Sequence, residues 1–286
     1  MQDSVHIPTG LSGEKPAEDP SNVAGKLNQS TVNCLYEAKI AGFRRLVTVT
    51  WCKNLMAHDL SIALEKPGTS DNHYTCKIEL KPWYFWSKKG FKSFEIDGKK
   101  LDFYWDLRTA KFSGSPEPFA DFYVALVFEE EVVLLMGDLK KEAFKKTKAR
   151  PSLTDAVLLS KREHVFGKRS FVTRARFDER VNKAHEIIIE CPVNGILNHE
   201  LWISIDGMVL IQVNNLQWKF RGNDTIMVNK LPVQVFWDVH DWIFGIGSGH
   251  ALFIFKPDSP HSGEQRHFSG EGLTGFCLFL YAWKIE

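Results

Sequence analysis

The stretch FYWDLRTAKF (103–112) shares a Trp-Asp pair with VFWDVHDWIF (235–244), and the second pair follows the first by 132 positions. A shift of 140 aligns TVNCLYEA (31–38) with FVTRARFD (171–178), which indicates a shorter connection in the second copy. Self-similarity of this kind predicts an internal duplication of about one domain length. Without a gap, the shift of 132 also aligns Trp86 with Trp218, Gly90 with Gly222, Ile96 with Val228, and Tyr104 with Phe236.

Each copy has the pattern of short β-strands. Val32, Cys34, Tyr36, Ala38 and Ile40 alternate with mostly polar neighbours, which is the period of two of a half-buried strand. We predict a mostly β fold of two tandem antiparallel β-barrel or β-sandwich units, related by the duplication. A lipocalin-like double barrel is one such arrangement, by analogy of topology alone. Further strand-length runs are VTVTW (47–51), DLSIALE (59–65) and YTCKIELK (74–81).

The region between the two copies has helical character. Leu139, Ala143 and Phe144 recur near a helical period, and Pro151 stops the pattern. The first residues of the chain lack aromatic side chains and are rich in Ser, Gly, Glu and Lys, a composition typical of disorder. The expected segments are a disordered tail (1–29), a first β unit (30–140), a basic helical linker (141–169) and a second β unit (170–286).

Composition limits the classes of function. The chain has 286 residues, and its 36 Lys and Arg nearly balance its 35 Asp and Glu, so no general field attracts nucleic acid. The five cysteines are odd in number and scattered, which favours a reducing compartment. We find neither a signal peptide nor a run of about 18 apolar residues. The sequence therefore predicts a cytoplasmic or nuclear protein without a transmembrane segment.

Several long motifs resemble those of a plant family of unknown function, the domain of unknown function numbered 868. The resemblance covers about 30–286 and implies a plant protein, with no activity or catalytic residue to carry over. The motifs that carry it are NLQWKFRGNDTIMVNK (215–230), VFWDVHDWIFG (235–245), MGDLKKEAFKKT (136–147) and KREHVFGKR (161–169).

The two Trp-Asp stretches oppose a polar face to an apolar one. Asp106 and Arg108 share the polar face of the first strand, and Asp238 and His240 share that of the second. If these faces point into a lumen, Asp238 with His240 could act as an acid–base pair, and Asp106 with Arg108 as an orienting pair. The alternative is that the faces are solvated, or that each Asp caps a turn.

Aromatic residues suggest a ligand. The run WYFW (83–86) has more successive aromatic side chains than one buried face accepts. The first hypothesis is binding of an apolar small molecule, a plant metabolite, in a lumen or in the groove between units. The second is an isomerase or cyclase without cofactor that acts on such a metabolite. The expected ligand-contacting residues are Trp83, Tyr84, Trp86, Tyr104 and Phe236.

The basic run KKEAFKKTKAR (140–150) is the strongest charge asymmetry of the chain. It predicts an exposed site that docks an acidic protein or an anionic lipid, and the alternative is a solvated helix face. We expect no specific recognition of nucleic acid. The lysines expected to bind the anion are Lys140, Lys141, Lys145 and Lys146.

No motif indicates a metal or a cofactor. Ser248 in GIGSGH lacks the strand–turn–helix context of a nucleophile elbow. No spacing suited to a metal site is found among His164, His240, His250, His261 and His267.

Overall fold

The computed structural model describes residues 29–53, 58–65, 73–80, 88–167, 169–178, 183–194, 198–245, 249–258 and 275–284. In this part of the chain strands predominate, with two short helices, α2 (Lys140–Thr147) and α3 (His240–Phe244). The predicted mostly β fold is confirmed. Of the tail predicted to be disordered, only the last position lies within the described residues.

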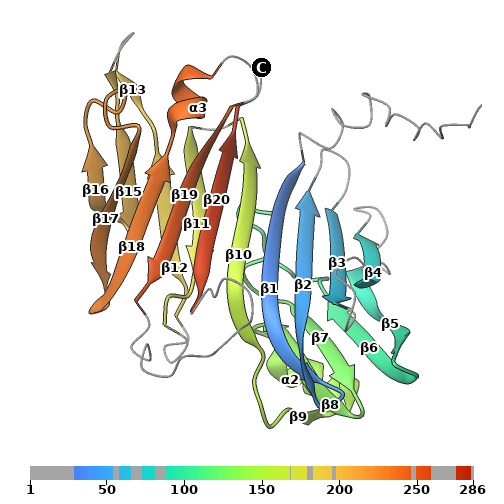
Figure 1. The fold of residues 1–286 in the computed structure, drawn as a ribbon. Helices are drawn as coiled ribbons and strands as arrows, with labels where there is room; N and C mark the ends of the chain where they lie inside the picture. The colour runs from blue at the N-terminus through green and yellow to red at the C-terminus, as the bar shows by residue number, and fades with distance from the viewer. Residues whose placement is uncertain are drawn as a thin grey trace, which may run out of the picture.

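The largest sheet has nine strands and runs through both units (Figure 1). Neighbouring strands pair antiparallel except β10 and β20, which are parallel. β10 therefore joins the β1–β4 meander of the first unit to the β17–β20 meander of the second. The order of strands is β17 (Arg221–Val228), β18 (Leu231–Asp238), β19 (His250–Pro257), β20 (Cys277–Trp283), β10 (Val157–Phe166), β1 (Ser30–Ile40), β2 (Phe43–Lys53), β3 (His58–Glu65) and β4 (His73–Leu80).

Two smaller sheets each pack against one half of the large sheet. The first comprises β5 (Lys89–Ile96), β6 (Lys99–Asp106), β7 (Tyr123–Phe128), β8 (Glu131–Gly137) and β9 (Arg150–Pro151). The second comprises β11 (Ser170–Ala175), β12 (His185–Glu190), β15 (Leu201–Ile205) and β16 (Met208–Val213). A separate ribbon pairs β13 (Val193–Asn194) with β14 (Asn198–His199). Each half of the molecule is thus a two-layer β-sandwich.

Alternating burial builds the two cores. Val47, Val49 and Trp51 of β2 are fully buried, and their neighbours are partly exposed, as the period of two predicts. The first core joins these residues to the inward side chains of β6, such as Phe103. The second core is built in the same way from the second small sheet and β17–β20.

None of the sheets in the described residues closes into a barrel, so the predicted barrel form is not found. The edge of β1 that would have to meet β8 is paired with β10 instead, and β8 is paired with β9. Only the start of the predicted helical linker is helical, as α2. Its later part is β10, because ladder bonds to β1 and β20 outweigh local propensity.

An ion cluster lies on the inner face of β10, at the seam between the two cores. The Nζ atom of Lys161 is 2.7 Å from a carboxylate oxygen of Glu117 and 2.7 Å from one of Glu163. It also donates to the backbone carbonyl of Arg174 at 2.9 Å, and Glu163 accepts a hydrogen bond from Thr173. The cluster thereby ties the β6–β7 loop of the first unit to β11 of the second.

The ammonium of Lys161 stays charged although it is buried. Burial by itself would lower its pKa, but the adjacent carboxylates of Glu117 and Glu163 outweigh burial and raise it. Since a buried charge without a counter-ion is very unfavourable, the three side chains depend on one another.

We predict that Lys161→Met lowers the free energy of unfolding by about 3–5 kcal/mol, because it leaves the buried Glu163 carboxylate without its counter-ion. Urea denaturation measures the loss. The double variant K161M/E163Q should recover part of it, because no unpaired carboxylate then remains on β10. A single variant within about 1 kcal/mol of the unmodified protein would contradict this role.

Aromatic rings reinforce the parallel pair on the other face of the same strands. His164 of β10 stacks on Tyr281 of β20, with ring centroids 4.7 Å apart and an interplanar angle of 6°. The indole Nε1 of Trp283 donates to Nδ1 of His164 at 3.1 Å, and Trp283 also stacks on Phe166. Nδ1 of His164 must be unprotonated to accept this bond.

Stability should therefore fall in mild acid. Burial, helped by electrostatic repulsion from His250 and Arg162, lowers the pKa of His164. Below about pH 6.5 the unfolded chain takes up a proton that the folded chain resists, so the free energy of unfolding falls until the folded-state pKa is reached. His58 has a lowered pKa as well and contributes in the same direction.

Replacing His164 with Gln should flatten the dependence of stability on pH between about pH 7 and 5, since Gln does not titrate. Urea denaturation across this range, with H58Q as the matched variant, separates the two histidines. A slope in H164Q equal to that of the unmodified protein would show that His164 does not contribute.

Candidate functional site

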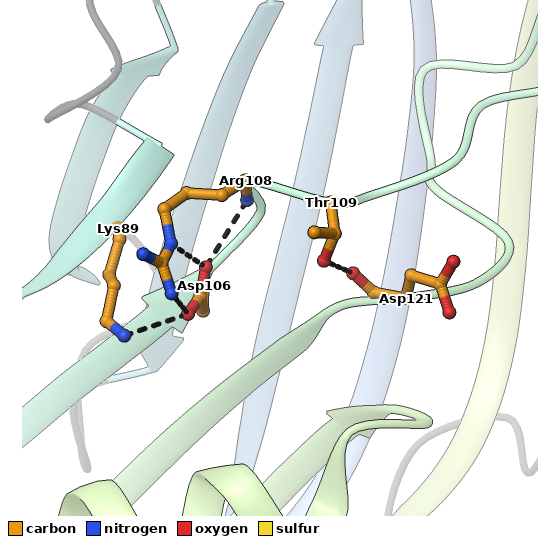
Figure 2. Close-up of polar contacts among 5 residues, drawn as sticks. All are labelled: Lys89, Asp106, Arg108, Thr109 and Asp121. Carbon is orange, nitrogen blue, oxygen red and sulfur yellow. Dashed lines mark hydrogen bonds and ion pairs between the residues drawn. The ribbon is translucent and has the colours of Figure 1, made fainter.

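The first Trp-Asp pair ends strand β6 and forms an ion cluster (Figure 2). Oδ1 of Asp106 accepts hydrogen bonds from the backbone N and the Nε of Arg108, at 3.3 and 3.0 Å. Oδ2 lies 2.9 Å from Nη2 of Arg108 and 3.0 Å from Nζ of Lys89. The predicted pairing of Asp106 with Arg108 is thus present in the structure.

Both carboxylate oxygens of Asp106 accept hydrogen bonds from cationic side chains. Burial alone would raise its pKa, but the hydrogen bonds from Arg108 and Lys89 outweigh burial and lower it. The group is a firmly ionised carboxylate whose lone pairs are used. This chemistry suits a structural ion pair and not a general acid or base at neutral pH.

The loop after β6 is tied down close by. Figure 2 shows Oγ1 of Thr109 donating to the backbone carbonyl of Asp121, at 2.9 Å. The carboxylate of Asp121 is 2.8 Å from Nζ of Lys111, and its backbone N donates to Asp138. These bonds fix the two ends of the loop that carries Glu117 to the seam.

The second Trp-Asp pair, at the end of β18, is more open. The side chain of Asp238 is 40% exposed, whereas that of Asp106 is 10% exposed. Oδ2 of Asp238 accepts from Nε of Arg221 at 2.7 Å, and Oδ1 accepts from the backbone N of His240 at 3.1 Å. Asp238 therefore accepts from the first backbone N–H of α3, while Val239 is the N-cap residue.

His240 does not direct its ring to Asp238, its predicted partner in an acid–base pair. Its Nδ1 lies 2.8 Å from Oδ1 of Asp241, the next residue of α3. This contact lowers the pKa of Asp241. The ring of His240 packs on Phe220 and Phe244, with centroids 5.0 and 5.4 Å away.

An exposed tryptophan lies in the same region. Trp218 is 81% exposed, in the loop before β17, and its backbone N donates to the carbonyl of Asn215. Trp237, by contrast, is buried, and its indole Nε1 donates to the carbonyl of Lys219 in that loop. Alternation did not indicate the exposure of Trp218, because a loop residue follows no strand period.

The same close packing occurs in both halves. A Cβ atom added to Gly90 would lie 2.8 Å from the ring of Trp105, and one added to Gly222 would lie 2.3 Å from the ring of Trp237. Each Trp thus lies across a glycine of the preceding strand, too close for any side chain. This packing requires a glycine opposite each tryptophan.

The residues predicted to contact a ligand are placed on outward faces where they are described. Tyr104 stacks on Phe91 beside α2, with centroids 5.5 Å apart. Phe236 is 37% exposed on the open face of the large sheet. Inward positions of β6 and β18 belong to the apolar residues, so the polar faces do not line a lumen. The rest of the predicted set, Trp83, Tyr84 and Trp86, lies outside the described residues.

Helix α2 presents its lysines to solvent. Ala143 is fully buried against the outer face of β7, in a small cluster with Tyr123 and Ala125. Lys148 ends the helix in a left-handed conformation. Among the described residues no carboxylate lies within ion-pair distance of the basic side chains of this helix and its end. These are Lys140, Lys141, Lys145, Lys146 and Lys148, all exposed as predicted.

A shallow pocket of about 210 Å³ lies at the end of the first sandwich, near the end of α2. Its rim is formed by the β1–β2 turn at Ala41 and Gly42, and by the loop after β9 at Leu153. Lys39 and Arg150 also line it, and Arg150 pairs with Glu131 at 3.4 Å. The pocket thus combines apolar and charged groups.

The described residues contain no group of three or more His, Cys, Asp or Glu placed to hold a metal ion. His164 and His250 take part in the aromatic stack, and His240 in the α3 corner. His261, His267 and Ser248 lie outside the described residues. No helix among the described residues has the length and apolar character needed to cross a bilayer.

A family profile matches residues 27–284, almost the whole chain. The chain belongs to DUF868, a family of plant proteins of unknown function. The resemblance inferred from the motifs is thereby confirmed. The DUF868 match includes both Trp-Asp corners, helix α2 and the seam at β10. No curated protein matches the chain.

The two corners should respond differently to loss of the carboxylate. We predict that Asp106→Ala lowers the free energy of unfolding by about 1–3 kcal/mol, because several charge-assisted bonds are lost from a mostly buried group. Asp238→Ala should cost less than about 1 kcal/mol, since the pair with Arg221 is exposed. Urea denaturation of both variants checks the order. A larger loss in D238A would contradict it.

Proposed function

We propose that this protein is a docking protein whose helix α2 binds a negatively charged partner. The observation that carries the proposal is the exposed lysines of α2, which have no counter-ion among the described residues. An exposed charge of this kind retains its field over about 8 Å at physiological salt. Because the net charge of the chain is only +1, the positive field of these lysines is local to the helix.

The backbone under the lysines is rigid. Ala143 packs on Tyr123 and Ala125, and Phe144 and Leu139 are partly buried in the same cluster. The helix is therefore anchored to a sheet by its apolar side while its basic side stays free. A fixed array of ammonium groups loses less conformational freedom on binding than the same residues in a flexible tail would.

The two other functions predicted from the sequence have less support. Uptake of an apolar metabolite requires an interior space, and the described cores are filled by large side chains such as Trp51, Phe103 and Phe253. Isomerisation or cyclisation without a cofactor requires a free acid or base. The carboxylates of Asp106 and Asp238 are engaged by Arg108 and Arg221.

We also propose that the two halves arose by duplication. β5 and β17 begin 132 positions apart, and so do β6 and β18. The same bond closes each corner, from the backbone N of Leu107 to the carbonyl of Lys88 and from that of Val239 to the carbonyl of Phe220. In addition, the free cysteines, of which most are buried, support the proposed site of action in the cytoplasm or nucleus.

Reversal of the charges on α2 tests the proposed function. K140E/K141E/K145E/K146E should abolish retention on a heparin matrix and leave the melting temperature nearly unchanged, because the four side chains are exposed. Exposed basic residues of the second unit without an ion pair among the described residues supply a matched control of equal charge change, R169E/K219E/K230E/K256E.

The control should keep most of its retention if α2 is the docking site. Equal loss in both variants would mean that only net charge matters, and retention that survives the α2 reversals would refute the proposal. Circular dichroism of both variants verifies that the fold is intact.

A further inference from the structure

Two large apolar side chains protrude at the end of the first sandwich. Phe43, directly after the β1–β2 turn, is 67% exposed, and Leu153, in the loop after β9, is 98% exposed. Single exposed apolar residues are common on protein surfaces and need no explanation. Leu153, however, lines the shallow pocket, and Phe43 directly follows Gly42, which lines it too. This end of the sandwich therefore exposes two large apolar side chains.

The β1–β2 turn lacks the first residue that its turn type favours. A two-residue hairpin turn with positive φ at both positions favours Asn-Gly or Asp-Gly. The β5–β6 turn at Asp97 and Gly98 and the β15–β16 turn at Asp206 and Gly207 follow this rule. The β1–β2 turn instead places Ala41 at φ 55°, a conformation that Ala adopts unfavourably. Ala41 is half-buried and packs against the first core, so the turn carries no polar side chain beside Phe43.

The surroundings of the two tips are mainly basic. Lys148 is the C-cap of α2 and lies two positions before Arg150, which lines the pocket. Lys39 lines the same pocket, is exposed, and has no carboxylate within ion-pair distance among the described residues. Figure 1 shows α2, β9 and the β1–β2 hairpin gathered at the lower end of the first unit.

The carboxylates at this end are partly neutralised. Glu37 pairs with Arg44, Glu129 with Lys99, and Glu131 with Arg150. Four further carboxylates here are exposed and form no ion pair among the described residues: Glu130, Asp138, Glu142 and Asp155. They are fewer than the basic groups without a partner, which are Lys39, Lys140, Lys141, Lys145, Lys146 and Lys148. The surplus is positive.

From this combination we infer that the end of the first sandwich docks to an anionic lipid bilayer. Phe43 and Leu153 enter the membrane interface, and the lysines of α2 face the lipid headgroups. The inference rests on the proposed function of α2 and names the partner. Apolar tips beside unpaired lysines complement a surface that is negative outside and apolar beneath. An acidic protein would satisfy the lysines but would not account for two separate apolar tips.

The geometry predicts which lysines matter most. An eight-residue helix is about 12 Å long, which exceeds the range of an exposed charge at physiological salt, about 8 Å. Lys145 and Lys146, in the last turn beside the tips, should therefore contribute more to bilayer binding than Lys140 and Lys141 in the first turn. Each reversal near the bilayer should weaken binding by about fivefold or more.

Sedimentation of the full chain with vesicles tests the inference. The protein should pellet with vesicles of phosphatidylcholine and phosphatidylserine, and not with phosphatidylcholine alone. F43S/L153S should weaken the binding about tenfold or more, because two large apolar side chains no longer enter the bilayer. Its retention on heparin should be unchanged, since no charge is altered.

Met208 and Val209 provide a matched control. Met208 follows the Asp206-Gly207 turn as Phe43 follows the Ala41-Gly42 turn, and both control residues are more than half exposed. M208S/V209S should bind vesicles like the unmodified protein.

The outcomes separate the inference from the proposed function. Retention on heparin without binding to phosphatidylserine vesicles would leave α2 as a docking site for an acidic macromolecule and overturn the bilayer inference. Vesicle binding by F43S/L153S equal to that of the unmodified protein would overturn it too. Failure of the unmodified protein to bind either heparin or vesicles would refute both proposals.

Discussion

The fold depends on a buried ammonium at the centre of the molecule. Strand β10 joins two sandwiches into one nine-stranded sheet, yet its inward positions at the seam are Lys161 and Glu163 in place of apolar residues. An apolar seam would have merged the two cores and could have packed in more than one register. Charged groups must meet particular partners, Glu117 from one unit and Thr173 from the other, so they specify one alignment of the units.

The Trp-Asp pair has the same structural role in both halves and a different environment in each. The tryptophan packs on a glycine of the neighbouring strand, and the aspartate ends the strand and holds the chain that follows. In the first unit two cations contact Asp106, while in the second the more exposed Asp238 pairs with Arg221 and accepts from the first backbone N–H of α3. A repeated motif therefore reflects repeated packing here, and only its surroundings distinguish the two sites.

The surface of the first unit combines properties that folding alone does not require. Lysines without partners repel one another, and the exposed Phe43 and Leu153 place apolar surface in water. Each feature lowers the free energy of unfolding only slightly, relative to a total of several kcal/mol. Their occurrence at one end of one sandwich is what favours a common role, since independent defects have no reason to gather there.

Sequence alone determined the mostly β character, the buried face of strands such as β2 and the exposure of the α2 lysines. A period of two identifies which side chains of β2 are buried, and clustered charges cannot all be buried, so both follow from local rules. Tertiary structure decided that β10 is a strand of a shared sheet, that Lys161 lies between two carboxylates, and that Gly42, next to Phe43, lines the same pocket as Leu153. These facts depend on pairing between residues far apart in the chain. Alternation specifies which face a side chain occupies, but only the folded chain specifies what lies opposite that face.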